Sequence, residues 1–148
     1  MGANGIQSFR DLDAWKVAMD LTVLAYEAAK RLPQSERYQL SSQIRRAAVS
    51  VPSNIAEGQS YGSDKRYLHH LRIALGSLGE LSTQMELAVR LDFVTFTDVE
   101  AMHKQLSRTR QLLFGLLRTI RRRRLAQAAK GATLLTTAFW LLQIAIAG

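Results

Sequence analysis

The chain has 148 residues, of which 47% are apolar and 22% are charged, and its formal net charge is +8. This is the composition of an ordinary globular domain, and it excludes wholesale disorder and collagen-like repetition. The sequence has no cysteine, which excludes a disulfide scaffold, thiol catalysis and cysteine-based zinc sites. The first nine residues contain neither a basic region nor an apolar run, so we expect no secretory signal and a cytoplasmic location.

The first expected helix covers residues 12–32, where apolar residues recur at helical spacing on a broad face. Ser8 or Asp11 is expected to cap its start. Pro33 is expected to end it, because the residue before a proline is disfavoured in the helical region.

A second helical pattern covers residues 40–58 and contains Pro52, which should kink the helix without abolishing it. Proline has no amide hydrogen, and Asn54 is expected to satisfy the backbone carbonyl that this leaves free. Four polar residues line one side of this helix with spacings of four, three and four: Arg46, Ser50, Ser53 and Glu57. They can form a polar ladder in which hydroxyls bridge an arginine and a carboxylate. Pairing between helices or subunits is the favoured interpretation, ahead of an active site.

Two further helical patterns complete the chain. The third covers residues 68–89, and its interior Gly76, Ser77 and Gly79 predict that another backbone packs closely against that side. The fourth begins after Thr97, a possible cap, and its apolar face consists of Val99, Met102, Leu106, Leu113, Leu117 and Ile120. No segment alternates with period two for long enough to predict a strand. The prediction is an all-α, antiparallel up-down-up-down four-helix bundle whose last helix can be extended by the C-terminal segment.

Positive charge is concentrated in one segment of the fourth helix. Residues 104–124 hold eight basic residues and no acidic one, whereas residues 1–103 are nearly balanced with 11 basic and 12 acidic residues. Such concentration favours a polyanionic partner, and the arginine fork suits phosphate. We therefore predict RNA or DNA binding by Lys104, Arg108, Arg110, Arg118, Arg121, Arg122, Arg123 and Arg124. The alternative is a solvated basic helix end.

The sequence offers little for catalysis or metal binding. His69 and His70 are adjacent and diverge by about 100° on a helix, and His103 has no acidic or histidine partner four residues away. There is no phosphate-binding glycine loop and no nucleophile elbow. We expect a protein that is not an enzyme and that uses neither a metal nor a cofactor.

Three blocks of sequence in a fixed order resemble a known family. They are FRDLDAW at 9–15, SQIRRAAVSVPSNIAEG at 42–58 and IALGSLGEL at 73–81. Together they resemble the four-helix-bundle proteins encoded by intervening sequences in bacterial 23S rRNA genes, which are similar to the accessory variability determinant of diversity-generating retroelements. The resemblance covers residues 9–123. It implies an antiparallel four-helix protomer, a barrel-like homopentamer, and a basic surface that contacts nucleic acid and reverse transcriptase in the retroelement relative.

The function expected from charge and resemblance together is a non-catalytic, oligomeric nucleic-acid-binding accessory or scaffold. The alternative is an interaction scaffold that does not bind nucleic acid and displays an apolar C-terminal helix for a protein partner or a membrane.

The C-terminal segment, residues 125–148, lies outside the resemblance, and we divide the chain into a bundle domain of residues 1–124 and this extension. Its apolar stretch of 17 residues is short for a bilayer span. It can be a native interaction helix, a graft joined through an alanine-rich linker, or a membrane anchor, which is the least favoured. We predict that it packs on its own bundle or on the same helix of another copy, through Leu134, Leu135, Phe139, Leu142 and Ile146.

Overall fold

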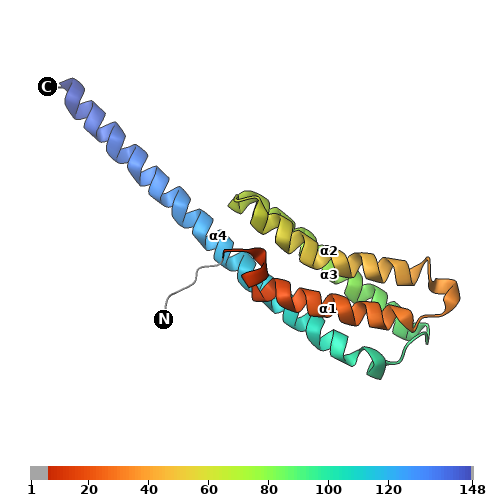
Figure 1. Ribbon diagram of the computed structural model, residues 1–148. Helices are drawn as coiled ribbons and strands as arrows, with labels where there is room; N and C mark the ends of the chain where they lie inside the picture. The colour runs from red at the N-terminus through yellow and green to blue at the C-terminus, as the bar shows by residue number, and fades with distance from the viewer. Residues whose placement is uncertain (1–6, 148) are drawn as a thin grey trace, which may run out of the picture.

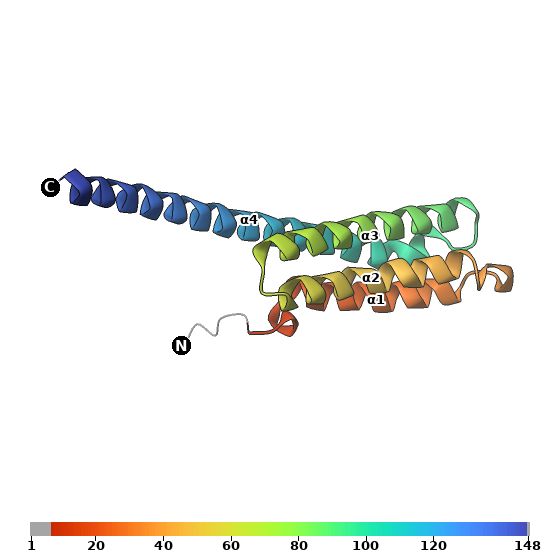
Figure 2. The same ribbon diagram turned by 90° about the horizontal axis from the view of Figure 1, so that it is seen from above.

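The protein was analysed as a computed structural model that describes residues 7–147, with side chains described for residues 7–131. This part of the chain forms α1 (Asp13–Lys30), α2 (Leu40–Ser60), α3 (Asp64–Arg90) and α4 (Phe96–Ala147), with short 3-10 turns η1 (Phe9–Asp11) and η2 (Gln34–Glu36). The four helices run alternately up and down around one core (Figures 1 and 2). Each helix packs on the next, and α4 closes the bundle against α1. The predicted all-α four-helix bundle is confirmed.

The start of α1 differs from the prediction. Ser8 and Asp11 cap η1, not α1: the Ser8 hydroxyl accepts from the Arg10 amide at 3.2 Å, and the Asp11 carboxylate accepts from the Ser8 amide at 2.8 Å. The helix itself begins at Asp13 and follows Leu12, which provides no side-chain cap. The two polar residues therefore stabilise a separate turn that precedes the helix.

Helix α2 continues through Pro52, as predicted, and Pro52 leaves the carbonyl of Ala48 without its usual donor. Thr22 of α1 supplies the replacement: its hydroxyl lies 3.0 Å from the Ala48 oxygen and 2.8 Å from the Ala18 oxygen. The Asn54 amide donates instead to the Ser50 oxygen at 2.9 Å. The prediction for Asn54 was wrong, because the freed carbonyl lies four residues before the proline and faces α1.

All six residues that the periodicity predicted for the buried face of α4 are buried: Val99, Met102, Leu106, Leu113, Leu117 and Ile120. Thr109, which the apolar pattern did not include, is buried on the same helix. The cap of α4 is Thr95, not Thr97. The Thr95 hydroxyl accepts from the Asp98 amide at 3.2 Å, and the Asp98 carboxylate accepts from the Thr95 amide at 2.9 Å. This reciprocal pair starts the helix two residues earlier than predicted.

Close backbone packing occurs at a glycine that the sequence analysis did not select. Apart from the backbone of α3 itself, no atom lies within 4 Å of a Cβ built on Gly76 or Gly79, so these two glycines make no close contact within the protomer. Of the three residues predicted to face a close neighbour, only Ser77 does, because it is buried and its hydroxyl lies 2.8 Å from that of Ser50 in α2. A Cβ built on Gly58 of α2 would lie 2.7 Å from Cδ2 of Tyr67 and 2.9 Å from Cβ of His70. Gly58 is therefore the position where α3 approaches α2 most tightly among these glycines.

Helix α4 extends well beyond the other three helices (Figures 1 and 2). Every residue from 121 to 131 is exposed, and the helix continues without a break across the predicted boundary at residue 124. At about 1.5 Å per residue, residues 121–147 add about 40 Å of helix. Because the helix runs away from the bundle, its end does not fold back onto the bundle's own surface.

The apolar face predicted for the C-terminal segment, formed by Leu134, Leu135, Phe139, Leu142 and Ile146, lies outside the residues whose side chains are described. A search of the described residues for a helix long and apolar enough to cross a membrane found none.

Candidate nucleic-acid interface and the pocket beside it

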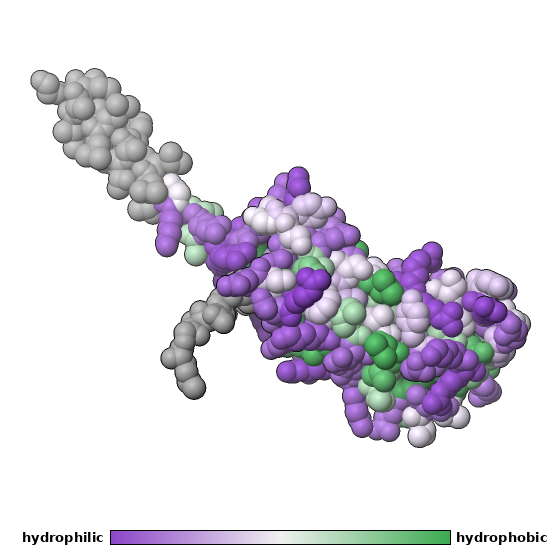
Figure 3. Space-filling model, in the orientation of Figure 1, coloured by the Kyte–Doolittle hydropathy of each residue, from purple (hydrophilic) through white to green (hydrophobic). Residues whose placement is uncertain are grey.

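All eight basic residues predicted to contact nucleic acid are exposed on α4. Lys104, Arg108, Arg118 and Arg122 lie on the side opposite the buried face, as their spacing predicts. The run 121–124 surrounds the helix at the point where it leaves the bundle, and Figure 3 shows hydrophilic residues there. We call the exposed basic surface from Lys104 to Arg124 the basic stripe.

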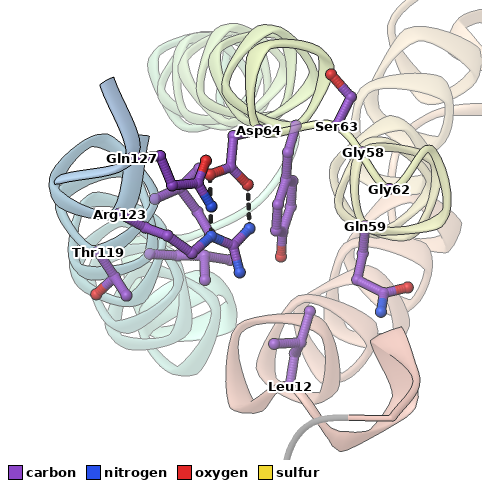
Figure 4. Close-up of a pocket in the computed structure, with 12 residues that line it drawn as sticks. Leu12, Gly58, Gln59, Gly62, Ser63, Asp64, Thr119, Arg123 and Gln127 are labelled. Atoms are coloured by element: carbon purple, nitrogen blue, oxygen red, sulfur yellow. Dashed lines mark hydrogen bonds and ion pairs between the residues drawn. The ribbon is translucent and has the colours of Figure 1, made fainter. Parts of the chain in front are cut away.

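Two members of the basic stripe have acidic partners. Lys104 Nζ lies 2.8 Å from Glu100 Oε1, one turn earlier on the same exposed surface. Arg123 binds Asp64 at the start of α3 with two N–H groups, one of them Nε at 2.9 Å from Oδ2 (Figure 4). Among the described residues, the guanidinium groups of Arg118, Arg121 and Arg122 form no ion pair. These three are available for phosphate, whereas Arg123 joins α4 to α3.

The Asp64 side chain is only 14% exposed. Hydrogen bonding from Arg123 holds the pKa of this carboxyl below its ordinary value, against the opposing effect of burial. The positive charges of Arg123 and Arg124 also lower the pKa of Asp64. Asp64 therefore remains ionised at neutral pH, and the Asp64–Arg123 pair has no net charge.

A pocket of about 500 Å³ lies beside this pair, at the end of the bundle where α4 emerges (Figure 4). Polar side chains from α2, α3, α4 and the turn between α2 and α3 line it: Gln59, Ser63, Asp64, Thr119, Arg123 and Gln127. Leu12, Leu116 and Ile120 provide apolar wall. Gly62, with φ of 60°, forms the tight turn at its edge, where a side chain would be strained.

Tyr67 also lines this pocket and is only 6% exposed. Its hydroxyl is buried and has no hydrogen-bond partner among the described residues. Burial raises the pKa of Tyr67 to about 12, so the phenol keeps its proton at neutral pH. A buried hydroxyl without a partner costs free energy, which makes this group a candidate for ligand contact.

No pattern in the sequence predicted this pocket. The glycines between α2 and α3 indicated a turn, but no periodic pattern placed that turn beside residues 119–127. Its residues come from distant parts of the chain, and only the bundle geometry brings them together.

Two of the four residues predicted to form a ladder on α2, Ser50 and Glu57, contact α3, but the four do not bridge one another. The hydroxyls of Ser50 and Ser77 share a hydrogen bond of 2.8 Å, and the Asn54 amide lies 3.1 Å from Ser50 Oγ. Nδ1 of His70 lies 3.0 Å from Asn54 Oδ1 and 3.3 Å from Glu57 Oε2. The connection between α2 and α3 thus includes three residues that were not part of the predicted ladder: Asn54, His70 and Ser77.

The other two ladder residues take no part in this connection. Ser53 donates to the carbonyl of Val49 in its own helix at 2.9 Å, and Arg46 is exposed. The adjacent rings of His69 and His70 lie nearly at right angles, with centroids 5.5 Å apart. Within the described residues, no group of three histidine, aspartate or glutamate side chains is arranged to hold a metal ion.

The chain is similar to a known family in sequence and to solved structures in fold. The family model described as 23S rRNA-intervening sequence protein matches residues 10–115. A solved structure from Bacteroides thetaiotaomicron, a protein of unknown function from the S23 ribosomal protein family, has a TM-score of 0.65 and 23% identity. The match covers 70% of this chain and 97% of that chain, and it shows a shared fold. No curated protein matches.

Proposed function

This chain belongs to the 23S rRNA-intervening sequence protein family, and we propose that it is a non-catalytic accessory protein that binds RNA or DNA through the basic stripe of α4. We place this activity in the cytoplasm. The observation that carries the proposal is the exposure of Arg118, Arg121 and Arg122 without acidic partners among the described residues.

Charge distribution supports phosphate as the ligand. No acidic residue follows Glu100 in the sequence, so the distal half of the stripe has no carboxylate of its own helix to neutralise it. Arginine holds a phosphate with two hydrogen bonds, and such contacts fix a protein on the nucleic-acid backbone without reading sequence. We therefore expect binding that depends strongly on salt and weakly on sequence.

We also propose that the protein self-associates, as a homopentamer. A groove of about 300 Å³ between α1 and α2 has an almost entirely apolar lining, which includes Trp15, Met19, Val49 and Pro52. Beside it, Val23 is 60% exposed, and Figure 3 shows apolar residues reaching the surface over α1. An apolar surface of this kind is typical of a protein interface. In a closed ring every protomer presents the same basic stripe, so weak contacts add up through avidity.

The assembly proposal is tested by light scattering coupled to size-exclusion chromatography. The full chain should have the mass of five protomers at micromolar concentration. Val23→Glu should lower that mass without unfolding the bundle, because the side chain is already exposed. A monomeric wild-type mass would overturn the proposal.

The binding proposal is tested by replacing Arg118, Arg121 and Arg122 together with glutamine. Affinity for a 20-nucleotide RNA, as single strand and as duplex, is measured by fluorescence anisotropy. The matched control replaces three exposed arginines outside the basic stripe with glutamine: Arg37, Arg72 and Arg90. It lowers the net charge by the same three units.

We expect the stripe variant to bind both RNA forms at least tenfold more weakly, and the control variant to bind within about twofold of wild type. Equal losses in the two variants would indicate a diffuse charge effect and refute the assignment of the stripe. Unchanged binding by the stripe variant, or no binding by wild type, would favour the alternative scaffold that does not bind nucleic acid.

A further inference from the structure

The pocket beside the basic stripe has the chemistry of a nucleobase site. We propose that it receives the base of an unpaired nucleotide whose neighbouring phosphates lie on the arginines of α4. This inference rests on the proposed function and deepens it, since it predicts a preference for unpaired over paired nucleic acid.

The charges of the pocket lining balance each other. Among the described residues, Asp64 and Arg123 are the only charged ones that line it, and they bind each other. The other polar side chains of the lining are neutral: the amides of Gln59 and Gln127 and the hydroxyls of Ser63, Tyr67 and Thr119. A neutral lining of donors and acceptors suits a neutral heterocycle better than an anion, because an anion would face the Asp64 carboxylate without a free cation to balance it.

The pocket combines apolar wall with polar groups, as a nucleobase requires. A nucleobase is flat, with apolar faces and a hydrogen-bonding edge. Leu116, Ile120 and Leu12 provide apolar surface for the faces, and the amides provide partners for the edge. The volume of about 500 Å³ falls within the range of about 300–1,000 Å³ that is typical of small-molecule sites.

The Tyr67 hydroxyl favours a ligand that has a hydrogen-bond acceptor. Tyr67 lines the pocket, and its hydroxyl is buried and has no partner among the described residues. A carbonyl oxygen or ring nitrogen on the edge of a base can accept a hydrogen bond from this hydroxyl. The pocket therefore offers a ligand a hydrogen bond that the described part of the protein leaves unmade.

The pocket lies next to the arginines that would hold the phosphates of the strand. Arg123 lies in the pocket wall, and Arg121 and Arg122 are its neighbours on the exposed helix. A strand whose backbone follows α4 at these residues passes the mouth of the pocket. Turning a base out of a duplex costs unpairing and unstacking energy, whereas an unpaired base avoids most of that cost. The pocket thus distinguishes unpaired from paired nucleic acid, whereas the arginines bind the phosphates of both.

The test compares Tyr67→Phe with wild type on a 20-nucleotide single-stranded RNA and on the duplex of the same sequence. Loss of one hydrogen bond to the base should weaken single-strand binding about fivefold to tenfold and leave duplex binding unchanged. Tyr38→Phe, at a fully exposed tyrosine away from the pocket, is the matched control and should change neither. The melting temperature of Tyr67→Phe should not fall, because the substitution removes a hydroxyl without a protein partner.

A second variant avoids the core altogether. Gln127 lies on the exposed part of α4, so Gln127→Ala cannot unfold the bundle, and it should weaken only single-strand binding, by about threefold. Single-strand binding at wild-type strength by both variants would overturn the pocket assignment and leave the proposed function intact. Equal weakening on single strand and duplex would also overturn it. If wild type binds neither RNA form, the proposed function fails first, and the pocket assignment fails with it.

Discussion

Gly58 gives the most direct test of how α2 and α3 pack, and Gly58→Ala is the perturbation. The added methyl carbon would lie 2.7 Å from Cδ2 of Tyr67 and 2.9 Å from Cβ of His70. Carbon atoms pack best at about 3.5 Å or more, so the Tyr67 ring or the helix must move by about 0.8 Å. Overpacking of this kind costs about 1–3 kcal/mol. Replacing glycine by alanine inside a helix contributes about 1 kcal/mol in the opposite direction.

The matched control is Gly115→Ala in α4, where no other atom lies within 4 Å of the added carbon. It should raise the free energy of unfolding by about 0.5–1 kcal/mol, which is the propensity gain alone. Gly58→Ala should therefore be less stable than Gly115→Ala by about 1–3 kcal/mol. The assay is urea denaturation followed by circular dichroism, with all chains at one protomer concentration because the proposed assembly would add stability by mass action. Equal stabilisation by the two substitutions would refute the tight packing at Gly58.

Three further predictions follow from the contacts described. Thr22→Val should lower the unfolding free energy by about 1–3 kcal/mol, because it leaves the Ala48 carbonyl without a donor, while Thr22→Ser should restore most of it; equal losses in urea melts would contradict this. Asp64→Asn should cost up to about 1 kcal/mol at neutral pH, since the contact with Arg123 is partly exposed. The folded pKa of Asp64 is depressed, so the stability that ionised Asp64 contributes is full above the ordinary pKa of 3.8 and is lost as pH falls through the folded pKa. The difference in melting temperature between wild type and Asp64→Asn should therefore close only in acid, and a difference that closes on the alkaline side would contradict this. Deleting residues 132–148 should leave oligomer mass and RNA affinity unchanged, as expected of an appendage to the family domain; loss of either would show that this segment takes part, and flotation of the intact chain with liposomes would support the membrane-anchor interpretation.

The sequence was sufficient to predict the helices and the buried face of α4, because these depend on spacing along one element. Residues 99–120 repeat apolar positions every three or four residues, except at the buried Thr109, and a bundle helix must bury that side. The same reasoning placed Lys104 and Arg108 on the opposite, exposed side.

Features that depend on two elements meeting could not be predicted in the same way. Pro52 showed that a carbonyl would lack its donor, but that the donor is Thr22 follows only from the packing of α1 on α2. Gly76 and Gly58 look alike in sequence, yet only Gly58 faces a neighbouring helix closely. Arg123 could not be separated from its neighbours, because its partner Asp64 is 59 residues earlier in the chain.

The most direct test of nucleic-acid binding by the basic stripe is the salt dependence of single-stranded RNA affinity. The slope of the logarithm of the association constant against the logarithm of salt concentration counts the phosphates that the protein neutralises. Replacing Arg118, Arg121 and Arg122 with glutamine should make this slope shallower by about two for each protomer in contact with the strand, while the variant lacking Arg37, Arg72 and Arg90 should keep the wild-type slope. A stripe variant with an unchanged slope would contradict the account.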